Sequence, residues 1–213
     1  MKNLKTVAFM PIRLNSKRVK QKSVRDFGGR PLFCWALERL DQLGIAVYIY
    51  CSAVDEIRGH LDFRPRNIAI EKRPIALDSD QTKGIEIYKA FAEAVDADVY
   101  LLAHATSPFI TTNTYKVALD AVQSGNHDSA LTVKRIQSFC WFSGSPLNFS
   151  LPRVQTQLLQ PVFVETSAVY AYTKPILGLG DRSSLNPKLI ELTSPEDEDI
   201  DTEDDFSRCL NFL

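Results

Sequence analysis

Charged side chains near the two ends of the chain have types and spacings that suit phosphate chemistry. The segment PIRLNSKRVKQKSVRDFGGRPL, residues 11–32, carries many cations ahead of any regular pattern, among them Arg13, Lys17, Arg18, Lys20, Lys22 and Arg25. A loop with so many cations either lies in solvent or meets a polyanion. A triphosphate fits this loop because its oxygens need several donors at close quarters.

Carboxylates dominate the segment SPEDEDIDTEDDF, residues 194–206. Asp199 and Asp201 flank Ile200, which indicates a short extended stretch whose two carboxylates point the same way. Such a pair suits Mg²⁺, with phosphate oxygens completing the coordination. Most acidic runs are instead solvated starts of helices, and that explanation suffices for the acids at 203–205.

The formal charge of the whole chain is −1, yet the charge is sorted along it. Residues 1–30 carry nine Lys or Arg and one Asp, whereas residues 191–213 carry nine Asp or Glu and one Arg. The near-neutral total argues against a globally basic nucleic-acid coat and against an acidic disordered tail. Nucleic acid is further disfavoured as a partner because the basic loop lacks the interleaved aromatic residues that single-strand binding needs.

Length and composition predict a single domain that spans residues 1–213. A hydrophobic content of 45% suits one core, since single cores are usual up to roughly 250 residues. No apolar run approaches the roughly 18 residues that span a bilayer, and the apolar stretch near the start is too short for a signal peptide. We therefore expect a soluble cytoplasmic protein without a membrane partner. The four cysteines form no CxxC pair, which predicts reduced thiols rather than disulfides or zinc.

Apolar runs and amphipathic segments alternate along most of the chain. Strands are predicted at 6–12, 47–52, 67–72, 98–105, 129–135, 162–174 and 188–193. Helices are predicted at 31–44, 54–63, 82–95, 112–125 and 202–213. This order predicts an α/β fold in which helices cover both faces of a mainly parallel sheet. Ligands of such sheets lie beyond the carboxyl ends of the strands, so the loops after 12, 52, 73 and 105 are the candidate site.

The alternation stops at residues 136–161, IQSFCWFSGSPLNFSLPRVQTQLLQP, which predict an irregular, loop-rich arm. This arm holds four large aromatic residues that something must cover: Phe139, Trp141, Phe142 and Phe149. We expect it to pack against a second subunit, which makes the protein a homodimer. The alternative is that the arm folds back on its own sheet.

Five segments resemble, in the same order, the signatures of the CMP-sugar synthetases, the cytidylyltransferases that activate acidic keto-sugars such as N-acylneuraminate. PIRLNSKRVKQKS resembles PARxGSKxxxxKN, and RPIALDSDQTKG resembles RPxxLAxDxxxx. LLAHATSPFI is similar to LLQPTSPxR, and QLLQPVFVETSAVYAYTK to QDLPPxYxENGxxYxxxK. DIDTEDDF is similar to DIDTxxDF. Together the five segments extend from residue 11 to residue 206.

The resemblance implies a three-layer α/β/α Rossmann-like nucleotidyltransferase in which the anomeric hydroxyl of an acidic keto-sugar attacks the α-phosphate of CTP and releases pyrophosphate. Mg²⁺ would act as Lewis acid and charge clamp.

Roles carried over from the family are expectations for residues of this chain. The expected triphosphate ligands are Arg13, Lys17 and Lys22, and other residues expected to contact the nucleotide are Ser23, Arg73, Gln81 and Lys83. Asp199 and Asp201 would hold the metal. The expected catalytic residues are Arg13, Lys22 and Asp201. The expected sugar-side residues are His104, Gln157, Glu165 and Tyr170.

Departures from the family signatures fall mostly where the base and the sugar are recognised. Asn15 replaces the glycine of GSK, Ser23 replaces the asparagine that reads cytosine, and His104 replaces the glutamine of LLQPTSP. The triad ENG is Glu165-Thr166-Ser167, and Gln155 stands where the family has an arginine that the nearby Arg153 could replace. A strand-end core histidine is the alternative for His104.

Several readings therefore stay open from the sequence. The leading one is a CTP-dependent transferase, the second keeps the fold with another NTP or acceptor, and the third is a non-catalytic nucleotide or sugar sensor. The sequence identifies no general base: metal-bound hydroxide, Asp201 through a water and the sugar's own lowered pKa are all options. We expect no catalytic role for His60 or His127.

Overall fold

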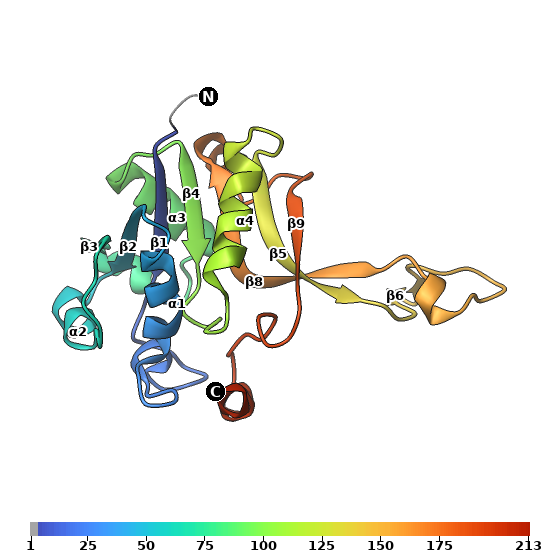
Figure 1. Cartoon of the computed structure of the whole chain (residues 1–213), viewed down its shortest axis with the longest axis horizontal. Coiled ribbons are helices and arrows are strands. Elements are labelled where there is room, and N and C mark those ends of the chain that lie inside the picture. Colours follow the sequence, from blue (N-terminus) through green and yellow to red (C-terminus); the bar gives the residue numbers. More distant parts are fainter. Residues whose placement is uncertain (1–3) are drawn as a thin grey trace.

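A seven-stranded sheet forms the centre of the protein, whose computed structural model describes residues 4–213. The strands lie in the order β3-β2-β1-β4-β8-β5-β9 (Figure 1). They are β1 (Thr6–Pro11), β2 (Ala46–Cys51), β3 (Ile68–Lys72), β4 (Val99–Ala103), β5 (Ser129–Ile136), β8 (Val162–Thr173) and β9 (Lys188–Leu192). All neighbouring pairs are parallel except those of β8, which runs antiparallel to both β4 and β5. The prediction of a mainly parallel sheet is confirmed.

Helices cover both faces of this sheet and give three layers (Figure 1). On one face lie α1 (Leu32–Asp41), α2 (Val54–Gly59) and α4 (Thr112–Gln123), whose apolar side chains pack against alternate residues of the strands. On the other face lie α3 (Gly84–Ala94) and the 3-10 helix η4 (Lys174–Leu179). The apolar strands are buried on both sides, which is why they read as nearly continuous hydrophobic runs. The α/β/α prediction is confirmed.

The carboxyl ends of β1 and β4 point to the lower edge of the sheet in Figure 1. At that edge lie the basic loop, residues 12–31, and the C-terminal helices α5 (Glu203–Cys209) and η5 (Leu210–Phe212). Short 3-10 turns η1 (Lys22–Val24) and η2 (Ile75–Asp78) complete the loops there. The fold therefore gathers both ends of the charge distribution at one edge.

A β-bulge interrupts the pairing of β5 with β8. Leu131 pairs with Tyr170, but Val133 pairs with Glu165, so β8 has extra residues opposite Thr132. The Thr132 hydroxyl lies 2.8 Å from the Thr166 hydroxyl and accepts a hydrogen bond from the backbone N–H of Val169. Within the bulge, Ser167 takes a left-handed backbone conformation with φ 58°. A bulge re-aims side chains, and this one brings Glu165 and Tyr170 together although five positions separate them.

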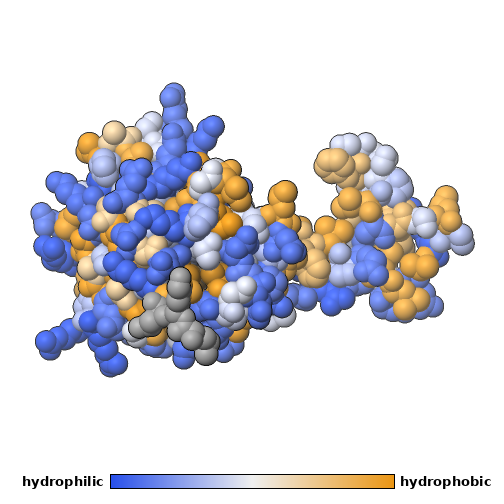
Figure 2. Space-filling view, turned by 90° about the horizontal axis from the view of Figure 1, so that it is seen from above, coloured by the Kyte–Doolittle hydropathy of each residue, from blue (hydrophilic) through white to orange (hydrophobic). Residues whose placement is uncertain are grey.

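The segment between Ile136 and Val162 projects from the sheet as an arm (Figures 1 and 2). It holds a small hairpin, β6 (Trp141–Phe142) and β7 (Ser145–Pro146), followed by the turn η3 (Thr156–Leu158). Trp141 is 55% exposed and Phe142 70% exposed. The arm does not fold back on its own sheet, contrary to the alternative considered above.

Two further predictions concern the cysteines and the membrane. All four cysteines are free; Cys140, on the arm, is only partly buried, while the other three are buried. Within residues 4–213 the helices are too short or too polar to cross a bilayer.

Candidate functional site

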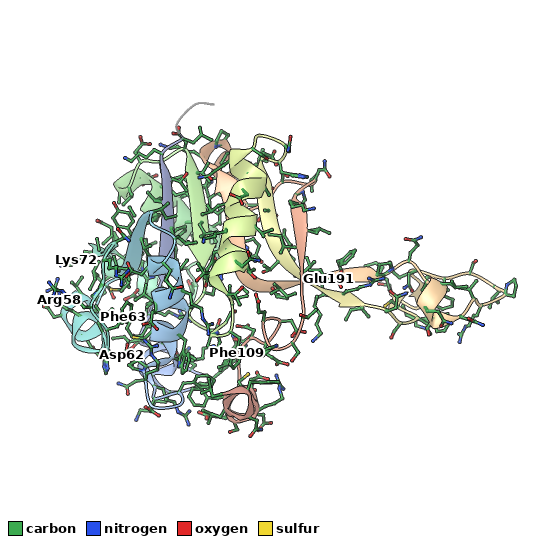
Figure 3. The ribbon with its side chains drawn as sticks, viewed as in Figure 1. Arg58, Asp62, Phe63, Lys72, Phe109 and Glu191 are labelled. Atoms are coloured by element: carbon green, nitrogen blue, oxygen red, sulfur yellow. The ribbon has the colours of Figure 1, made fainter. Side chains whose placement is uncertain are left out.

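An apolar cluster joins the two charged ends of the chain at the lower edge of the sheet. It is formed by residues from the basic loop, α1, the loop after β4 and the C-terminal segment: Val19, Phe27, Leu32, Phe109, Ile200, Phe206 and Cys209. Figure 3 shows Phe109 between the sheet and α5, and its ring packs edge-on against Phe27 at 6.1 Å. Burial of these side chains fixes the basic loop against the acidic segment, because apolar surface is removed from water on both.

Ion pairs also join the basic loop to the acidic segment. Lys22, whose side chain is 11% exposed, donates to the Ile200 carbonyl at 2.6 Å and to the Asp201 carboxylate at 3.1 Å. Arg18 lies 3.0 Å from the same Asp201 oxygen, although it is largely exposed. Arg25 pairs with Glu203 at 2.6 Å and lies over the ring of Phe206. Lys22 is therefore the cation that connects the loop to the carboxylates in a protected position.

A cavity of about 180 Å³ opens beside Lys22. The end of β1, the basic loop and the segment after β4 line it with Pro11, Arg13, Ser16, Lys17, Arg18, Val19, Lys22, Ser23, His104, Ala105 and Thr106. The cavity wall therefore contains five of the predicted site residues, Arg13, Lys17, Lys22, Ser23 and His104, and Lys22 connects it to Asp201.

Asp199 and Asp201 were predicted to hold a metal ion. Asp199 is half-buried, and the hydroxyl of Ser107 lies 3.5 Å from its carboxylate. Burial raises the pKa of Asp199, and the neighbouring Asp201 carboxylate contributes to the rise while Thr106 opposes it. Ile200 between them is fully buried, and its N–H donates to the Thr106 carbonyl at 2.9 Å. This backbone anchor holds the two carboxylates on one short segment.

The donor chemistry of this pair fits Mg²⁺. Within residues 4–213, no three His, Cys, Asp or Glu side chains are grouped so as to hold a metal ion by themselves. Mg²⁺ commonly uses one or two carboxylates and takes its remaining ligands from water and substrate phosphates. A carboxylate pair beside a cationic cavity matches that pattern, since the cations would hold the phosphates.

Asp80 neutralises the outer part of the basic loop. Its carboxylate lies 3.3 Å from Arg13 and also pairs with Lys17. These contacts are exposed and exchangeable, because surface pairs contribute about 0–1 kcal/mol. Phosphate oxygens can thus replace Asp80 at little cost.

Arg73 lies beneath the loops rather than free in the phosphate cavity. Its side chain is 1% exposed and donates to the Ile12 carbonyl at 2.9 Å, to the Tyr50 carbonyl at 3.3 Å and to Asp78 at 3.1 Å. Buried backbone and carboxylate acceptors thus use the donors of Arg73, and its contact with the nucleotide stays a prediction. Its role is to hold the ends of β1 and β2.

Arg73→Ala is expected to lower the free energy of unfolding by about 3 kcal/mol, because it leaves the Asp78 carboxylate and two carbonyls without their donors. Urea unfolding followed by circular dichroism measures this. Arg58→Ala, which removes an exposed cation 3.4 Å from Asp55, is the matched control and should change stability by less than about 0.5 kcal/mol. Equal effects of the two substitutions would contradict the assignment.

Gln81 and Lys83 lie outside the cavity wall. Gln81 is exposed, and the backbone N–H of Lys83 donates to Glu86 at 2.6 Å at the start of α3. Gln157 lies on the arm, where it contacts Gln155. The single chain therefore does not bring these three residues together with the loop cations.

His104 follows β4 and lines the cavity. Its Nε2 lies 3.5 Å from the Tyr88 hydroxyl, and its enclosed Nδ1 has no hydrogen-bond partner among the described residues. Burial lowers the pKa of His104 to about 4, and the positive charge of Arg182 adds to this effect. The imidazole is therefore neutral near pH 7.

This pKa makes stability depend on pH. Between pH 6.5 and 4 the unfolded chain protonates His104 while the folded chain does not, so stability falls as pH falls. Relative to His104→Gln, the native protein should lose about 2 kcal/mol more between pH 7 and pH 5. Urea unfolding at both pH values tests this, and parallel losses in the two proteins would contradict it.

Glu165 and Tyr170, both predicted on the sugar side, meet on the α3 face of the sheet. The Tyr170 hydroxyl donates to Glu165 at 2.7 Å and accepts from Arg182 at 2.8 Å. The Arg182 guanidinium lies 4.1 Å from the centre of the Tyr170 ring and 3.7 Å from Glu165. Sequence reasoning missed Arg182 because it lies between η4 and β9, outside every family signature.

The sheet, the basic loop and the carboxylate pair together define the class of the protein. A mainly parallel sheet with a cation-rich loop after its first strand, and a carboxylate pair opposite that loop, is an α/β fold of the nucleotidyltransferase type. The profile of the family described as cytidylyltransferase matches residues 7–167. The chain belongs to the cytidylyltransferase family, which confirms the predicted resemblance at the level of the family.

Solved structures agree on the fold. CMP:2-keto-3-deoxy-manno-octonic acid synthetase, solved in complex with CTP, matches with a TM-score of 0.72 and 18% identity over 98% of both chains. The 4-diphosphocytidyl-2C-methyl-D-erythritol synthase from Anaerococcus prevotii DSM 20548 matches with a TM-score of 0.68 and 12% identity, over 98% of this chain and 97% of that one. Rv0371c from Mycobacterium tuberculosis H37Rv matches with a TM-score of 0.64 and 11% identity, over 99% and 100%. No curated protein sequence matches significantly.

Proposed function

We propose that this protein transfers CMP from CTP to the anomeric hydroxyl of an acidic keto-sugar, with Mg²⁺, and releases pyrophosphate. The observation that carries the proposal is the contact of Lys22 with Ile200 and Asp201, which makes the cationic cavity and the carboxylate pair parts of one site. Membership of the cytidylyltransferase family and the fold shared with a CMP-sugar synthetase support it.

In this reaction the anomeric hydroxyl releases its proton to solvent and its oxygen forms a bond to the α-phosphorus of CTP, while the bond from that phosphorus to the bridging oxygen breaks. Pyrophosphate leaves with the electron pair. Lys17, Lys22 and Arg13 bind the triphosphate and offset the charge that develops on the leaving group. Asp199 and Asp201 would hold Mg²⁺, which supplies Lewis-acid stabilisation of the phosphate oxygens.

The cluster around Tyr170 supports an acidic acceptor. Arg182 is half-buried and aligned by Tyr170 and Glu165, so its guanidinium can donate to a carboxylate of the acceptor with little loss of side-chain entropy. His104 lies edge-on to Tyr170 at 6.3 Å and also lines the phosphate cavity. The acceptor would therefore lie between Arg182 and the α-phosphate.

Pyrophosphate release with a panel of ulosonic and nonulosonic acids tests the proposal. Release should require CTP, Mg²⁺ and the acid together. Arg182→Gln should raise KM for the acid about tenfold or more while leaving KM for CTP within about twofold, because one charge-assisted hydrogen-bond pair is lost. No release with any acid would overturn the acceptor assignment.

A second acceptor class is favoured by one observation, the match to a synthase that makes a diphosphocytidyl polyol. In that reading a polyol phosphate replaces the keto-sugar, and Arg182 meets its phosphate. The same assay with polyol phosphates decides between the two. Release with these and not with the acids would establish the alternative.

We also propose that the arm, residues 136–161, joins two copies of the chain. Its apolar side chains gather away from the body of the protein in Figure 2, and Trp141, Phe142 and Leu147 are each more than half exposed. Exposed apolar groups of this size mark interfaces more often than free surface. In a dimer, Gln157 could meet the partner's site.

Sedimentation equilibrium at micromolar concentration should give twice the chain mass of 24.0 kDa. The double variant Trp141→Ser, Phe142→Ser should shift the protein to monomer, because it removes the large apolar groups of the hairpin. Lys188→Ser, an exposed change on β9, is the control. A native protein that sediments as a monomer would overturn the dimer proposal.

A further inference from the structure

A second cavity, of about 190 Å³, adjoins the phosphate cavity and shares Arg13 with it. It lies at the carboxyl ends of β1 and β2, where Ser52 follows β2 and Asp78 ends η2. Ile12 and Ile75 also line it, and apolar side chains of this kind can pack on the faces of a planar ring. A nucleotide with its phosphates beside Arg13 and Lys22 would place its base in or near this second cavity.

The polar groups of this cavity are fixed. Arg73, buried below, donates from Nε to Asp78 Oδ1 at 3.1 Å and from a second nitrogen to the same oxygen. The Ser52 hydroxyl donates to the other oxygen, Oδ2. Because Ser52 uses its proton on Asp78, its remaining lone pairs are acceptors, and the ionised carboxylate is an acceptor as well. At this part of the wall, Asp78 and Ser52 therefore present acceptors to the cavity.

We propose that Asp78 and Ser52 select the exocyclic amine of the cytosine base and so distinguish CTP from UTP. Cytosine offers an N–H₂ donor where uracil offers a carbonyl oxygen, and a carbonyl facing two acceptors makes no hydrogen bond. This inference rests on the proposed function, since it names the base reader of the same site.

The proposed base contact of Asp78 is particular to this chain and does not follow the family signature. In the family segment RPxxLAxDxxxx an alanine stands where this chain has Asp78. The residue expected to read the base, Ser23, is 8% exposed and lines the phosphate cavity, not the second one. The chain thus lost the family's asparagine at one position and carries a fixed carboxylate at another.

Calorimetric titration with CTP and with UTP, both with Mg²⁺, tests the inference in the full-length protein. The native protein should bind CTP at least about tenfold more tightly than UTP. Asp78→Asn should reduce this ratio about tenfold, because the amide can donate to the uracil oxygen, and Ser52→Ala should reduce it about threefold. A change in the net charge of the protein affects the binding of CTP and UTP alike, so it does not change the ratio of their affinities.

Two controls separate base reading from other effects. Asp55→Asn makes the same acid-to-amide change at an exposed position that does not line the second cavity and should leave the ratio unchanged. Asp80 lies two positions after Asp78 and pairs with Arg13 and Lys17 beside the phosphate cavity. Asp80→Asn should therefore change the affinities for CTP and UTP by the same factor. If Asp78→Asn does not fold, Ser52→Ala alone decides.

Tight CTP binding with an unchanged ratio in both Ser52→Ala and the folded Asp78→Asn would overturn the inference and leave the proposed function standing. Failure of the native protein to bind either nucleotide would instead overturn the proposed function and the inference with it.

Discussion

Lys22→Ala is expected to lower kcat/KM for pyrophosphate release about 10³-fold, the loss typical of removing one well-placed electrostatic donor. Lys22 is the least exposed of the loop cations that form ion pairs, and it contacts both the Ile200 carbonyl and Asp201. Its charge therefore lies at the junction of the triphosphate and the carboxylates. Steady-state pyrophosphate release at varied CTP measures the loss.

Lys20→Ala is the matched control for this prediction. Lys20 is an exposed cation of the same loop that does not line the cavity, so its removal should change the rate less than about threefold. The urea midpoint of Lys22→Ala should stay within the range of the control, which separates chemistry from folding. A Lys22→Ala protein with native turnover would remove the basis of the proposed site.

Asp199→Asn and Asp201→Asn should each lower kcat about 10³-fold or more while the fold is preserved. Each amide is nearly isosteric with the carboxylate but lacks the charge that Mg²⁺ requires. The apparent affinity for Mg²⁺, measured from the dependence of the rate on Mg²⁺ concentration, should fall with the rate. Raised Mg²⁺ should restore part of the Asp201→Asn activity.

Asp204→Asn supplies the control, because this carboxylate lies exposed in the first turn of α5. It should leave both the rate and the Mg²⁺ dependence unchanged. The same variants also address the non-catalytic sensor considered from the sequence. Native function in cells that carry Asp199→Asn or Asp201→Asn would favour the sensor over the enzyme.

Strand and helix positions could be predicted from the sequence because the sheet is buried on both faces. Nearly continuous apolar runs between segments of helical period located all seven strands of the sheet to within about two residues. The direction of β8 could not be predicted, because an apolar run is the same in parallel and antiparallel pairs. The bulge opposite Thr132 depends on pairing between strands, which no local pattern contains.

Part of the candidate site could also be predicted from the sequence. Lys22 and Asp201 are separated by 179 positions, and the resemblance of ordered segments placed them together where composition alone could not. The contacts of Arg73 with backbone carbonyls could not be predicted, because an arginine that binds a ligand and one that binds backbone carbonyls look the same in sequence. Asp78 and Arg182 could not be predicted as site residues because neither belongs to a matched position, and their contacts are seen only in the folded chain.

The central claim is that the basic loop and the acidic segment hold one Mg²⁺–CTP complex between them. A crystal structure of the protein grown with CTP and Mg²⁺ tests it most directly. We predict triphosphate oxygens within hydrogen-bond distance of Lys17 and Lys22, and a metal ion about 2.1 Å from carboxylate oxygens of Asp199 or Asp201. A triphosphate bound elsewhere, or a metal ion away from both carboxylates, would contradict the account.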